Sequence, residues 1–267
     1  MDVHDARLRL SVVLASVLLA QSALGLLFRA QYRDPAWITT TWLGNDWVTL
    51  AVVVPLLAVA ARLARRGSVR ALLVWWGVLA YAVYNYAYYM FGAALNVFFP
   101  LYVAGILTAA VSLMLGLTAV APSEIARRFD AGIALRIAAA YFAAVGLSLA
   151  GIWMAMWAAY AFAGRPTPVD TEVFKLVAAL DTVLLVPGMA AGGLLLWRGH
   201  PCGYVMLPIV GVQGSLYLLV LSVNSILAVV NGFATAPGEI PVWGVLTATT
   251  VTVTLLLLTR AHGALEV

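Results

Sequence analysis

The chain has 267 residues, of which 64% are hydrophobic and 10% are charged, whereas an ordinary soluble domain contains about 25% charged residues. No globular core could enclose so much apolar surface, so the composition excludes a soluble enzyme or binding domain and predicts an integral membrane protein in contact with a lipid bilayer. The formal net charge is +4, but the arginines flank apolar segments. Membrane topology therefore explains the charge, and no nucleic-acid partner is expected.

Apolar runs predict about eight membrane-spanning helices, because roughly 20 residues of helix are needed to cross the hydrocarbon layer. We expect one all-α transmembrane domain, residues 1–267, with the first span an uncleaved anchor rather than a signal peptide. Residues 29–45 lack a continuous apolar run and are interpreted as an outer loop, with Asn45 and Asp46 capping the second span. The spans are predicted at 8–28, 47–61, 71–91, 101–119, 135–162, 174–197, 203–230 and 241–259.

The basic residues are distributed unevenly between the two ends of these helices. Eleven of the fifteen would lie on the side that holds both termini, and four, namely Arg29, Arg33, Arg165 and Lys175, on the other. Cytoplasmic loops of membrane proteins are enriched in Lys and Arg. We therefore expect both termini to be cytoplasmic.

Two halves, 1–122 and 123–267, carry related features. A shift of 126 residues aligns Ser22 and Gly25 with Ser148 and Gly151. Asp46 and Asp181 each lie near the outer start of the second helix of their half, and each is followed by a proline. Parallel four-helix repeats would place a binding site between the halves. Chance similarity between apolar helices is the alternative, and the sequence leaves both open.

An aromatic and polar stripe interrupts the third apolar segment, where residues 81–96 contain five tyrosines and two asparagines. On a helix, most of these side chains fall within roughly 60° of one line. An asparagine facing lipid would leave its donors and acceptors unpaired, so the stripe is expected to face other helices or a water-filled cavity.

Asp181 is the strongest candidate for a functional group, because it lies six residues beyond Lys175, roughly 9 Å deeper along a helix. An unpaired carboxylate there is costly, so it should be hydrogen-bonded, paired or protonated. We predict an outward-facing pocket that binds a small molecule or lipid. Its expected lining is Asp181, Asn85, Tyr81, Tyr88, Tyr89, Asn96 and Asn224, with Asp46 at the rim. A cap role for Asp46, interhelical hydrogen bonds for the asparagines and an interfacial belt for the tyrosines are the structural alternatives.

No cofactor or metal is expected, because the three histidines lie in predicted loops or tails and the single cysteine, Cys202, cannot form a metal cluster. The only lysine, Lys175, is near the outer end of its helix, which disfavours a mid-membrane Schiff base. The sequence also lacks a Gly-Lys-Ser/Thr phosphate loop and the motifs of zinc proteases and serine hydrolases.

The segments Gly-Asn-Asp-Trp-Val-Thr-Leu at 44–50 and Tyr-Asn-Tyr-Ala-Tyr-Tyr-Met-Phe-Gly-Ala-Ala-Leu-Asn at 84–96 are the most distinctive. With 180–198 and 201–204, they resemble an uncharacterised group of prokaryotic multi-span membrane proteins. The resemblance implies a prokaryotic plasma membrane, but it implies no activity, substrate or catalytic residue.

Three classes of function remain open. A small-solute or ion-coupled carrier would use Asp181 to bind a proton or cation. A membrane enzyme acting on a lipid or quinone would use Asp181 and a tyrosine as acid and base. A structural or partner-binding subunit would use the aromatic faces for docking. The sequence favours the first, and it says nothing about the oligomeric state.

Overall fold

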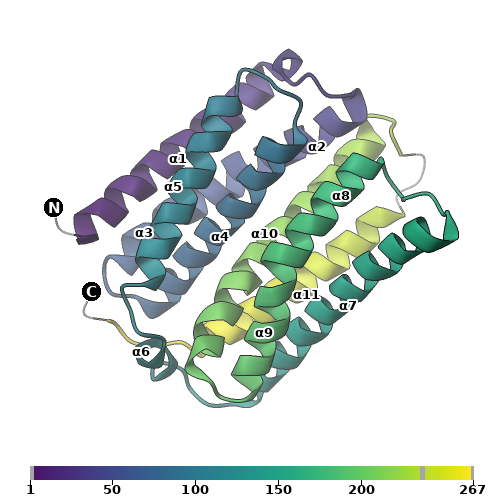
Figure 1. Ribbon diagram of the computed structural model, residues 1–267. Coiled ribbons are helices and arrows are strands. Elements are labelled where there is room, and N and C mark those ends of the chain that lie inside the picture. Colours follow the sequence, from purple (N-terminus) through teal and green to yellow (C-terminus); the bar gives the residue numbers. More distant parts are fainter. Residues whose placement is uncertain (1–2, 235–237, 266–267) are drawn as a thin grey trace.

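The computed structural model describes residues 3–234 and 238–265, and this part of the chain is a bundle of long helices (Figure 1). The prediction of an all-α transmembrane bundle is confirmed. The helices are α1 (Val3–Leu27), α2 (Ala36–Val48), α3 (Val54–Ala64), α4 (Val69–Gly92), α5 (Phe99–Leu117), α6 (Pro122–Ala126), α7 (Ile133–Ala163), α8 (Thr171–Leu180), α9 (Val186–Trp197), α10 (Pro201–Val230) and α11 (Glu239–Thr259), with a 3₁₀ turn η1 (Arg29–Gln31) and two π-helical segments, η2 (Thr49–Val53) and η3 (Asp181–Leu185).

Within the described residues, seven helical segments are long and apolar enough to cross a membrane, and two of them are composite. The helices α2, η2 and α3 join into one rod at 36–64, and α8, η3 and α9 join into another at 171–197. The 24-residue helix α4 runs beside these segments and holds the tyrosine stripe. The protein is therefore a multi-pass integral membrane protein of about eight spans.

The second span begins earlier than the sequence predicted. Helix α2 starts at Ala36, so residues 36–45 are helical, and Asp46 lies inside the helix instead of capping its start. The polar side chains of this helix bond to its own carbonyl groups: the Thr40 hydroxyl donates to Ala36 O at 2.9 Å and the Asn45 amide to Thr41 O at 2.8 Å. Such local bonds let a helix continue through a polar stretch.

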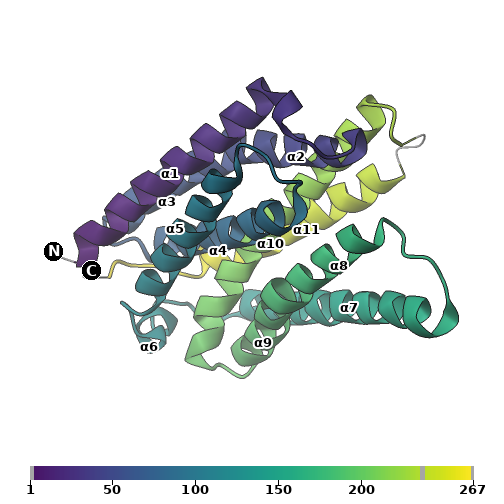
Figure 2. The ribbon, with the colours of Figure 1, turned by 45° about the horizontal axis from the view of Figure 1, so that its top comes forward.

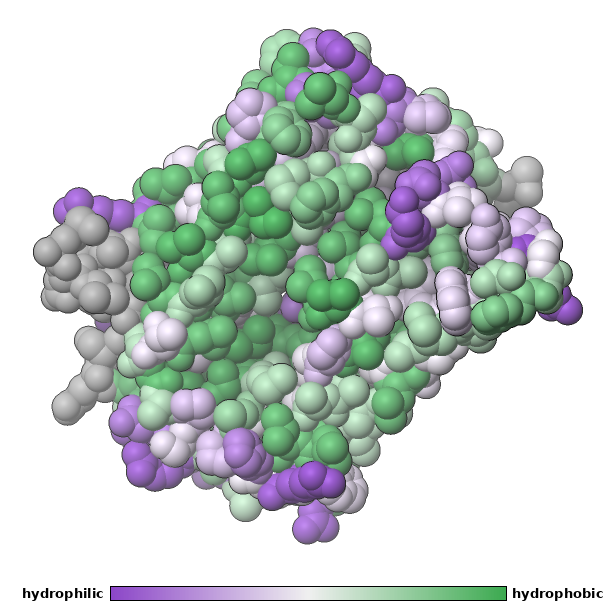
Figure 3. Space-filling model, in the orientation of Figure 1, coloured by the Kyte–Doolittle hydropathy of each residue, from purple (hydrophilic) through white to green (hydrophobic). Residues whose placement is uncertain are grey.

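The outer surface has the pattern of a protein in a bilayer. Figure 3 shows a broad hydrophobic band across the bundle, with hydrophilic residues gathered toward its two ends. Large apolar side chains such as Met114 and Val183 are more than two-thirds exposed on this surface, where lipid replaces water. The two ends of the described chain lie at one end of the bundle, near α6 (Figures 1 and 2).

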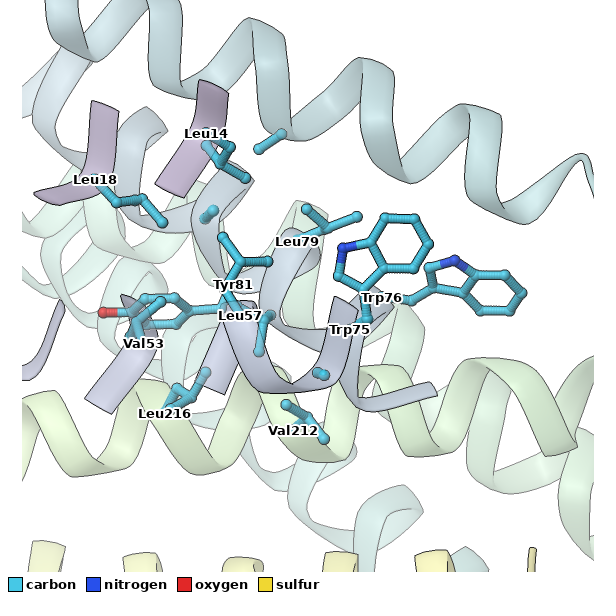
Figure 4. Packing of buried hydrophobic residues seen from close by; sticks show 14 of the residues in the cluster. Leu14, Leu18, Val53, Leu57, Trp75, Trp76, Leu79, Tyr81, Val212 and Leu216 are labelled. Atoms are coloured by element: carbon cyan, nitrogen blue, oxygen red, sulfur yellow. The ribbon is translucent and has the colours of Figure 1, made fainter. Parts of the chain in front are cut away.

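Helices α4 and α10 pack against each other in the interior. In the close view of Figure 4, Tyr81 and Trp76 of α4 lie between residues of the first half and Val212 and Leu216 of α10. A Cβ on Gly77 would lie 2.5 Å from Val212 Cβ, so this glycine permits the close approach of the two helices.

Residues 260–265 cross the end of the bundle that holds the termini and connect its two halves. Leu265 N donates to Gly67 O at 2.9 Å, in the turn before α4, and His262 N donates to Arg128 O at 2.8 Å, in the turn before α7. The Arg70 side chain adds a bond to Thr259 O at 3.0 Å. The C-terminal segment therefore fixes the halves to each other at this end.

Both composite spans contain the same break. Pro55 and Pro187 each stand at the start of the helix that follows a π-helical segment, 132 residues apart. In each case the residue before the proline donates its N–H to the first residue of the π segment, Thr49 or Asp181. Because proline has no N–H to donate, a local rearrangement before it costs little. A duplication of the two halves remains a hypothesis, and this element fits a shift of 132 residues instead of 126.

Candidate functional site

The carboxylate of Asp181 is 1% exposed and lies where α4, α7 and α10 meet η3. The Tyr84 hydroxyl donates to Oδ1 at 2.7 Å. The Trp153 indole N–H donates to Oδ2 at 3.1 Å, and the Tyr217 hydroxyl approaches Oδ2 at 3.5 Å. All three partners are neutral donors, so the charge of an ionised Asp181 is balanced only by dipoles.

The carboxylate of Asp46 is fully buried in the other half of the bundle. Its Oδ1 accepts from the Gln21 amide at 2.9 Å and from the Tyr89 hydroxyl at 2.8 Å, and its Oδ2 accepts from the Tyr32 hydroxyl at 2.6 Å. Burial, together with the adjacent Asp46, raises the pKa of Tyr32 well above its usual range, which keeps this hydroxyl a donor. Tyr86 extends the network by donating to Gln21 Oε1 at 3.2 Å.

A small cavity of about 50 Å³ lies at the boundary of the two halves and is lined by residues of α2, α4, α8 and α10. Tyr84 and Tyr217, which both approach Asp181, also line this cavity. The cavity lies in the half of the bundle away from the termini, since Asn85 is seven residues from the end of α4 and Asn224 six from the end of α10. The remaining lining residues are Asn45, Tyr81, Tyr88, Val177, Val220 and Leu221.

Two amide atoms of this lining lack a protein partner. Asn85 is 2% exposed and its Nδ2 donates to no atom of the described residues, while Asn224 Oδ1 accepts from none of them. Asn224 packs against α2, where a Cβ on Gly44 would lie 1.8 Å from its Oδ1. A buried donor and acceptor left open in this way are costly unless a ligand or water satisfies them.

The structure brings only part of the predicted pocket together. Asn85, Tyr81, Tyr88 and Asn224 line the cavity, and Asp181 adjoins it through Tyr84 and Tyr217. Besides Asp181, three predicted residues lie outside its lining: Tyr89 and Asp46 bond to each other, and Asn96 shapes the turn at 93–98, where its Oδ1 accepts from Phe98 N at 2.9 Å. Whether any of these residues binds a substrate stays a prediction.

Several partners of the two acids were missed by sequence reasoning. Gln21 and Trp153 each donate to an aspartate from the first helix of a half, and they are 132 residues apart, as are the two prolines. Tyr32 was placed in a loop, and Tyr217 in an apolar span. Of these partners, only Gln21 could have been singled out from the sequence, because a lone glutamine in an apolar helix needs a hydrogen-bond partner.

Together these features define a helical membrane protein with two buried carboxylates, one of them next to a polar cavity between two groups of helices. In comparisons with protein-family models, curated proteins and solved structures, nothing matches this chain.

Proposed function

We propose that this integral membrane protein is a carrier for a small uncharged solute, which binds in the cavity between α4 and α10. The observation that carries this proposal is that Asn85 and Asn224, which each have one amide atom without a hydrogen-bond partner among the described residues, both line one cavity. A solute with both a donor and an acceptor would satisfy them together.

The lining determines the chemistry of that solute. It contains amide, phenol and aliphatic side chains and no charged one, which favours a neutral, hydrogen-bonding molecule. A cavity of about 50 Å³ holds a few waters, since one water needs roughly 10–15 Å³ by this measure. The solute therefore has only a few non-hydrogen atoms unless the site opens further.

The position of the site supports a carrier. Many transporters bind their substrates between two groups of helices, beside helices that are interrupted within the membrane. Here the interruptions are η2 and η3, and Asp181 is the first residue of η3.

A membrane enzyme acting on a lipid or quinone is the second candidate. The 2.7 Å contact between Tyr84 and Asp181 supplies an acid and a base. However, a lipid headgroup or a quinone ring is too large for the cavity, so this function would need a different conformation. A structural or partner-binding subunit is the third candidate, in which the asparagines would hold helices together.

Solute flux into proteoliposomes tests the carrier directly. Urea, acetamide and glycerol serve as probes, and vesicle reswelling is followed by light scattering. We expect flux above that of protein-free vesicles for at least one probe, and a loss of at least tenfold in Asn85→Leu. The matched control is Gln213→Leu, which removes a buried amide of α10 that does not line the cavity. No protein-dependent flux, or equal loss in both variants, would contradict the proposal.

We also propose that the protein lies in a prokaryotic plasma membrane with both termini cytoplasmic, because most arginines lie at the end of the bundle that holds the termini. Single cysteines at Ser123 and Thr171, both exposed and at opposite ends of the bundle, are introduced after Cys202→Ser. An impermeant thiol reagent added to intact cells should label the variant at position 171 only. Labelling of position 123 instead would reverse the orientation.

A further inference from the structure

The groups around Asp181 do not provide a site for a metal cation. Its three neighbours, the Tyr84 hydroxyl, the Trp153 N–H and the Tyr217 hydroxyl, all present hydrogens to the carboxylate. Hard cations such as sodium, calcium and magnesium require several oxygen ligands around the ion. An indole nitrogen has no lone pair to offer, and among the described residues no cluster of three or more His, Cys, Asp or Glu is placed to hold a metal.

In the part of the chain that the structure describes, no cationic side chain compensates this acid from the elements packed around it. The titratable groups that face it are Tyr84 from α4 and Tyr217 from α10, while α7 presents Trp153, which does not titrate. Helix α9 contains no titratable residue, and in α8 the exposed Lys175 pairs with Glu172 near the other end of the helix. An ionised carboxylate inside a membrane without a cation is costly, and proton uptake removes that cost.

The two tyrosines connect Asp181 with the cavity, because each touches the carboxylate and also lines the cavity wall. A hydroxyl can donate and accept at once. A hydronium ion in the cavity gives a proton to the Tyr84 oxygen while Tyr84 passes its own proton to Asp181 Oδ1. The products are a protonated carboxyl, an unchanged tyrosine and one water, so atoms and charge balance.

We propose that Asp181 is a proton-binding site which loads and unloads through this cavity, and that the proton is the ion coupled to solute movement. The coupling rests on the proposed carrier function, whereas proton binding does not. A solute in the cavity separates Tyr84 and Tyr217 from water. Solute binding therefore controls when Asp181 can exchange a proton, because both processes use the same cavity.

Infrared difference spectroscopy of the full chain in liposomes tests proton binding without transport. Lowering the pH should produce C=O bands of protonated carboxylic acids, with the isotope shift expected in D₂O, and Asp181→Asn should remove one component of them. Asp130→Asn, at an exposed acid near the termini, is the control and should retain it. Tyr84→Phe keeps the acid but removes one hydrogen bond, so it should move the band in frequency. A band unaffected by both Asp181→Asn and Tyr84→Phe would overturn the proposal.

Coupling is tested in the same vesicles with the probe that shows the largest flux. An inward proton gradient should accumulate the probe at least several-fold, with no change when Na⁺ is replaced by choline. Accumulation that depends on Na⁺ and ignores the proton gradient would overturn the coupling. A titrating Asp181 band with no flux of any probe would overturn the carrier and leave the proton site standing, so the two failures are distinguishable.

Discussion

The two buried aspartates differ in what lies beyond their hydrogen bonds. Asp46 receives three bonds of 2.6–2.9 Å, and its partner Gln21 is itself bonded to Tyr86. Asp181 receives bonds of 2.7 and 3.1 Å and a weak one of 3.5 Å from Tyr217. The environment of Asp46 is closed by packing, whereas two partners of Asp181 border a cavity.

This difference assigns the two acids different tasks. A fully satisfied buried network fixes the helices that contribute to it, and the Asp46 network joins α1, the turn after it, α2 and α4. A less satisfied acid beside a cavity is free to exchange a proton.

Replacing each aspartate by asparagine should separate the sites most clearly. At Asp46, the new NH₂ group would face hydrogen-bond donors, and we expect the free energy of unfolding to fall by about 3 kcal/mol. At Asp181, Tyr84 and Tyr217 can turn their hydroxyls toward the cavity, so a loss of about 1 kcal/mol is expected. Reversible unfolding in mixed micelles measures both. Equal losses would remove the distinction between the two sites.

A second comparison uses two glycines that the sequence aligns. A Cβ on Gly25 would lie 2.2 Å from Asp46 Oδ2 and 2.5 Å from the Tyr32 hydroxyl, whereas a Cβ on Gly151 meets no atom within 4 Å. Gly25→Ala should therefore lower the unfolding free energy by about 2 kcal/mol through overpacking. Gly151→Ala should raise it by up to ~1 kcal/mol, because alanine favours the helix. A tolerated Gly25→Ala would show that the Asp46 network is loose.

The smallest difference is expected for single hydroxyl groups. Tyr89 donates to Asp46 Oδ1 at 2.8 Å and lies 3.1 Å from Trp42 O, so Tyr89→Phe should cost about 1.5 kcal/mol. Tyr217 is 3.5 Å from Asp181 Oδ2, and Tyr217→Phe should cost about 0.5 kcal/mol or less. The same unfolding assay decides, and a reversed order would contradict the hydrogen-bond geometry.

Most helix limits could be predicted from the sequence, because bilayer thickness and apolar composition determine them. The fifth predicted span, 135–162, is observed as α7 at Ile133–Ala163, and the last, 241–259, as α11 at Glu239–Thr259. The start of α2 could not be predicted, since its threonines bond within the helix and its Trp42 donates to Asp34 at 2.9 Å. Because these polar groups form hydrogen bonds locally, the segment is helical without the apolar run by which a span is predicted.

The candidate site was only half predictable. Asp181, Asn85 and Asn224 stand out as polar groups in apolar helices, and the structure groups them around one cavity or next to it. Their partners depend on how the helices pack, so Trp153 and Tyr217 looked like ordinary membrane aromatics. Pro55 and Pro187 indicated where the helices are interrupted. The sequence could not indicate which neighbours the side chains beside each interruption contact, because that depends on how the helices pack.

We propose that Asp181 couples proton movement to solute binding, while the hydrogen bonds of Asp46 hold the bundle together. The most direct test measures transport by Asp181→Asn in proteoliposomes, with and without an inward proton gradient. We expect the variant to equilibrate the small neutral probe across the membrane as the wild type does, but to lose accumulation driven by the gradient. Gradient-driven accumulation at the wild-type level by folded Asp181→Asn protein would contradict the account.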